Sequence, residues 1–378
     1  DARSAAVYAC GPPAMLEAVR LLCAEREVPC ELAMEAPMAC GFGACFGCAV
    51  PLAHGGYMRL CVDGPVVRGE AIETALMAGA RNGAVGPVTE LCGLRLAHPV
   101  INGSGTFDAI AARHAFGDAI LEEFPFSAFV SKTITPEPRA GNPPPRLWES
   151  ASGLINSIGL PNKGLEGFLE QDLPQLAELP VPLIVSLMAT SRDEFARLVE
   201  AVGAREEVSA LELNISCPNV KSGLVVGEEP EEAFALLDRV RPLTGKPLIV
   251  KLTPNAAPAP VAQAVAEAGA DAVSLINTLR AAALDPDGSG PWLGAGSGGL
   301  SGAAVRAIAL HQVREVSAAV AIPIVGMGGV ASGRDAAELI TAGASAVAVG
   351  TESFRDPAAG ARVAAELSEL LRAASAAA

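Results

Sequence analysis

The fold of this chain is decided by a stretch near its end, Pro323-Ile324-Val325-Gly326-Met327-Gly328-Gly329, together with Ala346-Val347-Ala348-Val349-Gly350-Thr351. Both are short apolar runs of strand length, and each run leads into glycine. Residues 333–342, which lie between them, have the length and pattern of an amphipathic helix. The stretch therefore predicts a β-α-β unit with two buried parallel strands.

The same alternation extends back to about Thr89. Further apolar runs predict strands at residues 99–102, 128–132, 183–187, 210–215, 248–252 and 272–277, with helices such as 230–240 and 259–268 between the later ones. Eight strands in β-α order over nearly 290 residues predict an α/β fold of the (β/α)8 TIM-barrel type. A doubly wound open sheet is the alternative. A barrel carries its chemistry at the C-terminal ends of its strands.

Composition excludes several classes of partner. The formal charge is -15, and the pI is near 4.8, which argues against nucleic acid or an anionic membrane surface. No apolar run is long enough to span a bilayer, and no signal peptide is evident, so the sequence predicts a cytoplasmic protein. In such a protein, nine cysteines are better explained as metal ligands and catalytic groups than as disulfides.

A thiol lies between two carboxamides in Asn214-Ile215-Ser216-Cys217-Pro218-Asn219. Apolar and polar side chains alternate through residues 211–215, which predicts a half-buried strand that ends near Pro218. We expect Cys217 to face a pocket, where a thiol can be tuned to accept a proton near neutral pH. The alternative is an inert cysteine that acts as a small buried hydrophobic residue.

Glycine turns follow the last two predicted strands, at Gly328-Gly329 and at Gly350-Thr351. In a barrel this is the usual phosphate site, although glycine there can also be plain turn chemistry. A second glycine loop, residues 298–302, lets the backbone approach the same ligand. A phosphate-bearing redox cofactor such as FMN satisfies both loops.

The cysteines near the start of the chain have metal-site spacing. Cys40, Cys45 and Cys48 form C-x4-C-x2-C, and Cys61 follows, which predicts a plant-type [2Fe-2S] cluster whose last ligand is closer than usual. Zinc is the rival, but paired C-x2-C knuckles are absent. The remaining cysteines outside the thiol motif are interpreted as structural: Cys10, Cys23, Cys30 and, in a hairpin-like stretch, Cys92.

Residues 7–15 predict a strand, a glycine turn and a helix start, with Met15, Val19 and Leu22 continuing an apolar stripe. Such a turn can face a nucleotide or simply connect two elements. The chain starts at Asp1, directly before this strand, as if it were cut inside a domain. We expect a remnant of a nucleotide-binding domain at 1–35, a cluster segment at 36–80, a linker at 81–88 and the barrel at 89–378.

From about Thr89 onward the sequence resembles the catalytic subunit of the NAD-linked (class 1B) dihydroorotate dehydrogenases. The motifs that carry the resemblance are residues 131–139 (SKTITPEPR), 156–162 (NSIGLPN), 214–219 (NISCPN), 250–254 (VKLTP) and 298–302 (GGLSG). Residues 1 to about 80 resemble the C-terminal part of that enzyme's electron-transfer subunit. The resemblance implies a fusion of two subunits, with the part that holds FAD and most of the NAD site outside this sequence.

The resemblance also implies a mechanism. Cys217 removes a proton from C5 of dihydroorotate while hydride leaves C6 for N5 of FMN, which gives orotate, an intermediate of pyrimidine biosynthesis. Electrons then pass to the cluster, to FAD and to NAD, and family members assemble from dimers of the barrel. The implied substrate-binding residues are Lys132, Asn156, Asn214, Asn219, Asn277 and Thr278. The implied FMN-binding residues are Ser104, Gly105, Lys132, Lys251, Gly302, Gly328, Gly329, Gly350 and Thr351.

Two departures and two rival functions remain. Residues 279–285 (LRAAALD) replace an expected Gly-Met-Ala-Ile-Asp run, and Gly103 stands where alanine is expected. The carboxamides could each be turn or strand caps, and the two lysines could be merely solvated. The chain could instead reduce uracil-type rings, as dihydropyrimidine dehydrogenase does, or be an inactive electron-transfer module.

Overall fold

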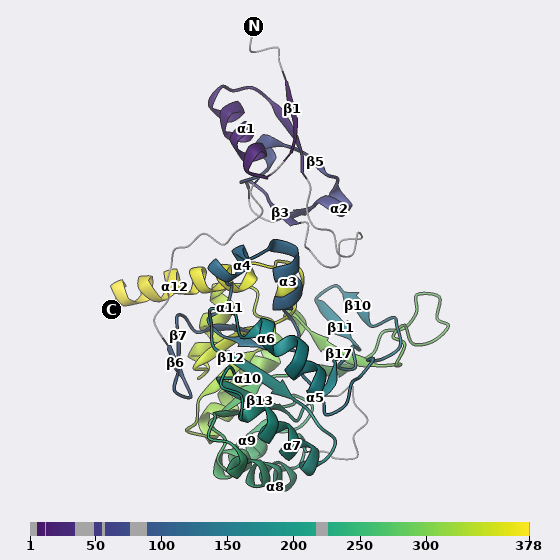
Figure 1. Cartoon of the computed structure of the whole chain (residues 1–378), viewed down its shortest axis with the longest axis vertical. Coiled ribbons are helices and arrows are strands. Elements are labelled where there is room, and N and C mark those ends of the chain that lie inside the picture. Colours follow the sequence, from purple (N-terminus) through teal and green to yellow (C-terminus); the bar gives the residue numbers. More distant parts are fainter. Residues whose placement is uncertain are drawn as a thin grey trace. The chain divides into compact units, whose positions relative to one another are not determined.

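The computed structural model describes residues 6–11, 13–34, 49–54, 57–75, 89–216 and 226–377. The chain divides into two compact units (Figure 1). The first comprises Asp1–Asn82 with Ala111–Glu123 and Ser353–Ala358, and the second comprises the rest. The domain boundaries expected from the sequence stay predictions.

In the first unit a small sheet packs against one helix. Strand β1 (Val7–Cys10) is parallel to β2 (Cys30–Ala33), and β5 (Val66–Arg68) is antiparallel to β2. Helix α1 (Pro13–Glu25) follows β1, which confirms the predicted strand, glycine turn and helix. The other elements before residue 75 are β3 (Ala49–Pro51), β4 (Tyr57–Arg59), α2 (Leu60–Asp63) and η2 (Gly69–Ala71).

Of the apolar stripe predicted for α1, only Val19 packs on the core. Met15 and Leu22 are 42% and 46% exposed, whereas Leu16 and Cys23 are buried against Leu32. Apolar residues occupy more than one face of this helix, so periodicity alone permits two stripes. The sheet selects the face that it covers.

The second unit contains eight parallel strands in the order β8-β19-β18-β15-β14-β13-β12-β9. Their bounds are β8 Val100–Asn102, β9 Phe129–Val130, β12 Leu183–Leu187, β13 Ala210–Asn214, β14 Leu248–Lys251, β15 Ala272–Leu275, β18 Ile324–Met327 and β19 Ala346–Val349. The order around the sheet follows the order along the chain, and β8 and β9 lie side by side. This nearly closed ring confirms the TIM-barrel prediction and rules out an open doubly wound sheet.

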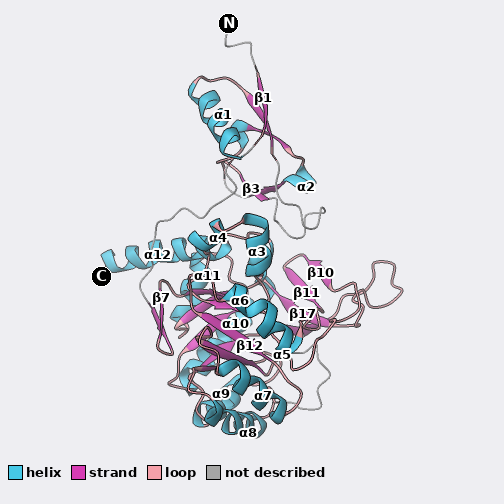
Figure 2. Cartoon of the chain, viewed as in Figure 1, coloured by secondary structure: helices cyan, strands magenta, loops and turns pink. Residues whose placement is uncertain are grey.

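Helices of the second unit pack against these strands (Figure 2). The helices of this unit are α5 Gly164–Gly167, η3 Phe168–Asp172, α6 Leu173–Leu176, α7 Arg192–Gly203, α8 Pro230–Val240, η4 Arg241–Leu243, α9 Pro258–Glu267, η5 Ala303–Val305, α10 Arg306–Ala319, α11 Gly333–Thr341 and α12 Ala359–Ala377. Three more, α3 Ala109–Phe116, α4 Ala119–Glu122 and η6 Thr351–Phe354, lie wholly or partly in the first unit. Local signals set their starts. In α7, for example, Ser191 and Glu194 form a reciprocal capping box.

The strand bounds agree with prediction to within two residues, and β9 is shortened at both ends. The sequence predicts a strand over 128–132, but only Phe129 and Val130 are in the ladder. After Val130 the chain leaves the sheet, and Ile134 forms an isolated bridge to Leu187. Because β9 is so short, regular ladder pairing is missing between β9 and β8.

A side chain closes that gap. Asn102 is fully buried, its Oδ1 accepts from the Val130 N–H at 2.7 Å, and its Nδ2 donates to the Val130 carbonyl at 2.8 Å. The carboxamide thus has one donor and one acceptor, as a backbone peptide would. Asn102 satisfies the edge of β9 where the main-chain ladder is missing.

The barrel has separate inner and outer cores. Ile184, Ala210, Ile249 and Ala272 belong to an inner cluster, and the intervening strand residues pack outward against the helices. The inner cluster includes Leu91 and Leu96 of a hairpin, β6 (Thr89–Leu91) and β7 (Leu94–Leu96), so this hairpin packs on the inner core.

The hairpin turn holds Cys92 and Gly93, both with positive φ. The Cys92 thiol donates to the Asp271 carbonyl at 3.3 Å. Burial, with a smaller effect from the nearby Asp271 charge, raises the pKa of Cys92 to about 12. A thiol with this pKa is not ionised near neutral pH, which supports its interpretation as structural.

A four-stranded antiparallel sheet, β10-β11-β17-β16, lies beside the barrel strands (Figure 2). Its strands are β10 Leu147–Ser150, β11 Gly153–Asn156, β17 Gly298–Ser301 and β16 Leu279–Ala281. The segment that departs from the family pattern therefore begins as β16 and continues as a loop. Trp292 of this loop packs edge-to-face on Trp148, with ring centroids 5.1 Å apart.

None of the helices in the described ranges is both long enough and apolar enough to cross a membrane.

We predict that Asn102→Ala destabilises the barrel strongly, because it leaves the Val130 N–H and carbonyl without their partners. The expected loss is about 2–4 kcal/mol in the free energy of unfolding by urea. Asn142→Ala is the control, since it removes one partly buried hydrogen bond to Ser157, and it should cost about 1 kcal/mol. Equal losses in the two variants would contradict closure by Asn102.

We also predict that Cys92 resists alkylation. With a pKa of about 12, about one thiol in ten thousand is ionised at pH 8. Iodoacetamide followed by peptide mass spectrometry should label the exposed Cys10 and leave Cys92 unmodified in the folded protein. Labelling of Cys92 at the rate of Cys10 would show that the hairpin does not bury it.

Candidate functional site

The barrel interior changes from apolar to polar along the strands. Two residues beyond the inner-core side chains, on the same face, stand Ser186, Glu212, Lys251 and Ser274, all buried. Residues 211–215 were expected to form a half-buried strand, but all of β13 is buried. A barrel strand faces helices on one side and the interior on the other, so its polar residues are enclosed as well.

Glu212 is the centre of this polar layer. Its Oε1 accepts from the Ser186 hydroxyl and its Oε2 from the Ser274 hydroxyl, both at 3.0 Å. The Lys251 Nζ is 4.0 Å from Oε1, and both side chains are less than a tenth exposed. At this distance the attraction is about 4 kcal/mol with an effective dielectric of about 20, much of which offsets the desolvation of two charges.

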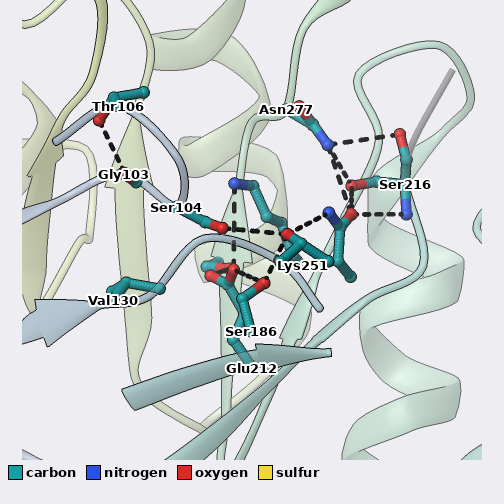
Figure 3. A network of polar contacts seen from close by, with 12 residues as sticks. Gly103, Ser104, Thr106, Val130, Ser186, Glu212, Ser216, Lys251 and Asn277 are labelled. Atoms are coloured by element: carbon teal, nitrogen blue, oxygen red, sulfur yellow. Dashed lines mark hydrogen bonds and ion pairs between the residues drawn. The ribbon is translucent and has the colours of Figure 1, made fainter. Parts of the chain in front are cut away.

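Hydroxyls and carboxamides continue from this layer to the ends of the strands (Figure 3). Thr133 Oγ1 lies 2.9 Å from the Ser186 hydroxyl and 3.2 Å from Asn214 Nδ2. Asn214 Oδ1 accepts from the Ser216 hydroxyl at 3.1 Å, and Ser216 in turn accepts from Asn277 Nδ2 at 2.8 Å. The predicted substrate residues Asn214 and Asn277 are thus in one network.

The loop after β8 joins the same network. The Ser104 hydroxyl donates to the Ser131 carbonyl at 2.9 Å and lies 3.1 Å from Thr133 Oγ1. Gly105, next in the chain, is exposed and has φ +73°. The Thr106 hydroxyl donates hydrogen bonds to the carbonyls of Gly103 and Val349, and the second bond joins this loop to the end of β19.

The predicted glycine turns also come together. Gly302, Gly328 and Gly329 all have positive φ, a conformation that favours glycine. A Cβ added to Gly329 would lie 3.0 Å from the Gly302 carbonyl oxygen, and Thr351 donates to the Ser301 hydroxyl. Gly350 precedes Thr351 at the end of β19. These turns expose backbone without side chains, which suits an anionic group.

Asn156 and Thr278 meet at a third glycine. Asn156 Nδ2 donates to the Gly299 carbonyl at 3.2 Å. A Cβ on Gly299 would overlap the Thr278 hydroxyl. The Thr278 N–H donates to Asn277 Oδ1 at 2.8 Å, so Asn156 belongs to the same end of the barrel as Asn277.

The two predicted lysines differ in burial. Lys132 is exposed just after β9, whereas Lys251 is 5% exposed. Within the described ranges, no acceptor lies within hydrogen-bonding distance of the Lys251 ammonium. An ammonium with so little exposure gains from a close acceptor, so this position fits a ligand that brings one.

Several predicted site residues lie outside the described residues: Cys217, Asn219, Cys40, Cys45 and Cys48. The backbone of Cys61 is in α2, but its side chain is not described. The described parts of the chain contain no group of three or more His, Cys, Asp or Glu residues that could hold a metal ion.

The sequence alone suggested no role for five polar residues of this site: Glu212, Ser186, Ser274, Thr133 and Ser216. The available signal was their position as polar residues inside or just after apolar strand runs. In a barrel such residues face the interior or its mouth, which would have identified them.

Comparison with known families supports this description. The model of the dihydroorotate dehydrogenase family matches residues 88–371. The model of the iron-sulfur cluster binding domain of dihydroorotate dehydrogenase B matches residues 35–73, the range that contains Cys40, Cys45, Cys48 and Cys61.

Curated relatives are similar over the barrel. Each of three bears the name dihydroorotate dehydrogenase B (NAD(+)), catalytic subunit. The protein from Geobacter metallireducens is 44% identical over 284 residues, 75% of this chain and 92% of the relative. The Desulforudis audaxviator protein is 46% identical over 74% of this chain and 91% of its own length. The Pelobacter propionicus protein is 46% identical over 72% of this chain and 90% of its own length.

We predict that Gly299→Ala distorts the site, because its Cβ would overlap the Thr278 hydroxyl. The expected loss in the free energy of unfolding by urea is about 1–3 kcal/mol. Gly245→Ala is the matched control, since nothing lies within 4 Å of its Cβ position, and it should change stability by less than about 0.5 kcal/mol. If both variants unfold at the same urea concentration, Gly299 is not needed for this close approach.

Proposed function

Since this chain belongs to the dihydroorotate dehydrogenase family, we propose that it oxidises dihydroorotate to orotate in pyrimidine biosynthesis. The observation that carries the proposal is the pair of linked carboxamides, Asn214 and Asn277, at the same barrel end as the little-exposed ammonium of Lys251, which lies 4.0 Å from Glu212. Carboxamides can match both the N–H and the C=O groups of a pyrimidine ring. A lysine can match an anion.

The substrate residues follow from this arrangement. Asn156, Asn214, Asn277 and Thr278 would bind the ring amides and the carboxylate, together with Asn219. Lys132 is exposed at its strand end, where an anionic substrate can reach it. These roles rest on position and residue chemistry.

The residues present fit FMN. The positive-φ turns would hold the phosphate: Gly302, Gly328 and Gly329 together with Gly350 and Thr351. Ser104 and Gly105 would contact the ring system, and Lys251 would donate to an acceptor on it. When bound, FMN supplies the two-electron acceptor for the hydride that leaves C6 of the substrate.

Cys217 would act as the general base. It follows β13 by three residues, in the same segment as Asn214, and it would take the proton from C5 of the substrate. Removal of a proton by the protein lets the neighbouring carbon lose hydride without building up charge on the ring. A thiolate is the form that can do this.

The N-terminal part would carry electrons. Cys40, Cys45, Cys48 and Cys61 would hold a [2Fe-2S] cluster, which supplies one-electron transfer. The match to the iron-sulfur binding domain supports this, as well as the proposal that the chain joins parts of two subunits. We expect FAD and NAD to bind outside this sequence. A homo-oligomer and a cytoplasmic location stay predictions.

Flavin bleaching tests the function. Purified protein that carries FMN should lose its flavin absorbance when dihydroorotate is added without oxygen. Dihydrouracil should have little effect, since it lacks the carboxylate. Bleaching by dihydrouracil alone would favour a dihydropyrimidine dehydrogenase activity, and no bleaching by either compound would exclude both enzymes.

We predict that Cys217→Ser lowers the rate of flavin reduction by dihydroorotate by about 10²–10⁴-fold. The pH at which the remaining rate rises should be higher, because a hydroxyl is a weaker acid than a thiol and is ionised only at higher pH. Cys10→Ser, which changes an exposed cysteine in the first unit, is the control and should retain the wild-type rate. An unchanged rate in Cys217→Ser would point to an electron-transfer module instead.

A further inference from the structure

We propose that Glu212 is a positioning residue that, through Ser186 and Thr133, fixes which end of the Asn214 carboxamide donates and which accepts. Glu212 itself does not reach the substrate in this arrangement, since it lies in the barrel interior below the strand ends. The inference rests on the proposed function, in which Asn214 binds the pyrimidine ring.

The first step concerns the Ser186 proton. The Ser186 hydroxyl lies 3.0 Å from Glu212 Oε1. Glu212 forms a buried ion pair with Lys251, and an ionised carboxylate only accepts hydrogen bonds. Ser186 has a single proton, so it must donate that proton to Glu212.

The second step concerns Thr133. Its Oγ1 is 2.9 Å from the Ser186 hydroxyl, and two oxygens at this distance need a proton between them. The Ser186 proton is already used, so the proton must come from Thr133. The neighbouring Ser104 hydroxyl donates to the Ser131 carbonyl, or can itself donate to Thr133. In either case Thr133 has no proton left for Asn214.

The third step fixes the carboxamide. The Asn214 atom that lies 3.2 Å from Thr133 must be a donor, which makes it Nδ2. Oδ1 then faces Ser216, where it accepts from the hydroxyl at 3.1 Å. Ser216 accepts from Asn277 Nδ2 at 2.8 Å, and Asn277 Oδ1 accepts from the Thr278 N–H.

The hydrogen bonds therefore run in one direction. They begin at the Thr278 amide, pass through Asn277, Ser216, Asn214, Thr133 and Ser186, and end at Glu212. Figure 3 shows Asn277, Ser216, Ser186 and Glu212 of this series. Bonds aligned in this way strengthen one another. A carboxylate is the only common side chain that can end such a chain without donating in return.

The direction matters because a pyrimidine ring presents donors and acceptors in a set order. If the Asn214 carboxamide turned over, an acceptor would face an acceptor and a donor would face a donor. Without the Ser186 hydroxyl, Thr133 can give its proton to Asn214 Oδ1, and only the contact from the Ser216 N–H at 3.4 Å then still favours the observed orientation. Part of the free energy of binding the ring would then be used to hold the Asn214 carboxamide in one orientation.

Two serines on the same carboxylate provide a matched experiment. Ser186→Ala and Ser274→Ala each remove one buried hydroxyl that donates to Glu212 at 3.0 Å. Only Ser186 also contacts Thr133. Orotate binding to the full chain with oxidised FMN can be followed by the change in the flavin spectrum. We expect Ser186→Ala to weaken orotate binding about tenfold and Ser274→Ala less than about twofold.

Equal weakening in the two variants, or no weakening in Ser186→Ala, would overturn the inference. Because a buried serine can be needed for folding, Thr133→Val and Thr133→Ser form a second pair. Thr133→Val keeps the shape and removes the hydroxyl, and we expect it to weaken orotate binding. Thr133→Ser keeps the hydroxyl and should restore the wild-type affinity; loss in both would indicate packing instead.

A measurement without substrate separates this inference from the proposed function. In protein labelled with ¹⁵N-asparagine, the side-chain NH₂ signal of Asn214 can be identified by its loss in Asn214→Asp. Ser186→Ala should shift or double this signal, and Ser274→Ala should not. If wild-type protein binds neither orotate nor dihydroorotate, the proposed function fails. If the Asn214 signal is the same in Ser186→Ala as in wild-type protein, the positioning role of Glu212 is overturned.

Discussion

The closure of the barrel between β8 and β9 is the constraint on which the site depends. Regular ladder pairing joins the other neighbouring strands, but this junction depends on the Asn102 carboxamide bound to the Val130 N–H and carbonyl, with Ser127 bound to the Val100 carbonyl. Because the ring closes, the C-terminal ends of strands far apart in the sequence lie together. The Ser104 loop after β8 can then contact Thr133 after β9.

Closure also encloses every strand on both faces, which creates a problem for polar residues. A carboxylate and an ammonium in the interior, Glu212 and Lys251, are expensive unless each meets partners. Ser186 and Ser274 satisfy the carboxylate from the two sides. The Lys251 ammonium has no acceptor within hydrogen-bonding distance among the described residues, only the Glu212 carboxylate at 4.0 Å. The same chemistry that stabilises the polar layer prepares it for binding.

The glycine turns and the hydrogen-bonded carboxamides at this end of the barrel suit different parts of a ligand. In the proposed function, positive-φ turns at Gly302 and Gly329 would let the backbone come close to a phosphate, while the carboxamides of Asn214 and Asn277 are held by hydroxyls. Glycine turns bind by shape and backbone dipoles, which tolerate little side-chain bulk. Oriented carboxamides bind by a fixed order of donors and acceptors. A flavin beside a pyrimidine requires both kinds of recognition.

The sequence by itself determined the barrel, because period and spacing of apolar runs are local properties that survive without tertiary contacts. It also determined the family motifs and the cysteine spacing near Cys40. Only the tertiary structure decided which face of α1 is buried, since Met15 and Leu16 are equally apolar. It alone placed Glu212 inside the barrel and joined it to Asn214 through Thr133, because these contacts link β13, β12 and the loop after β9, which become neighbours only when the strands pair.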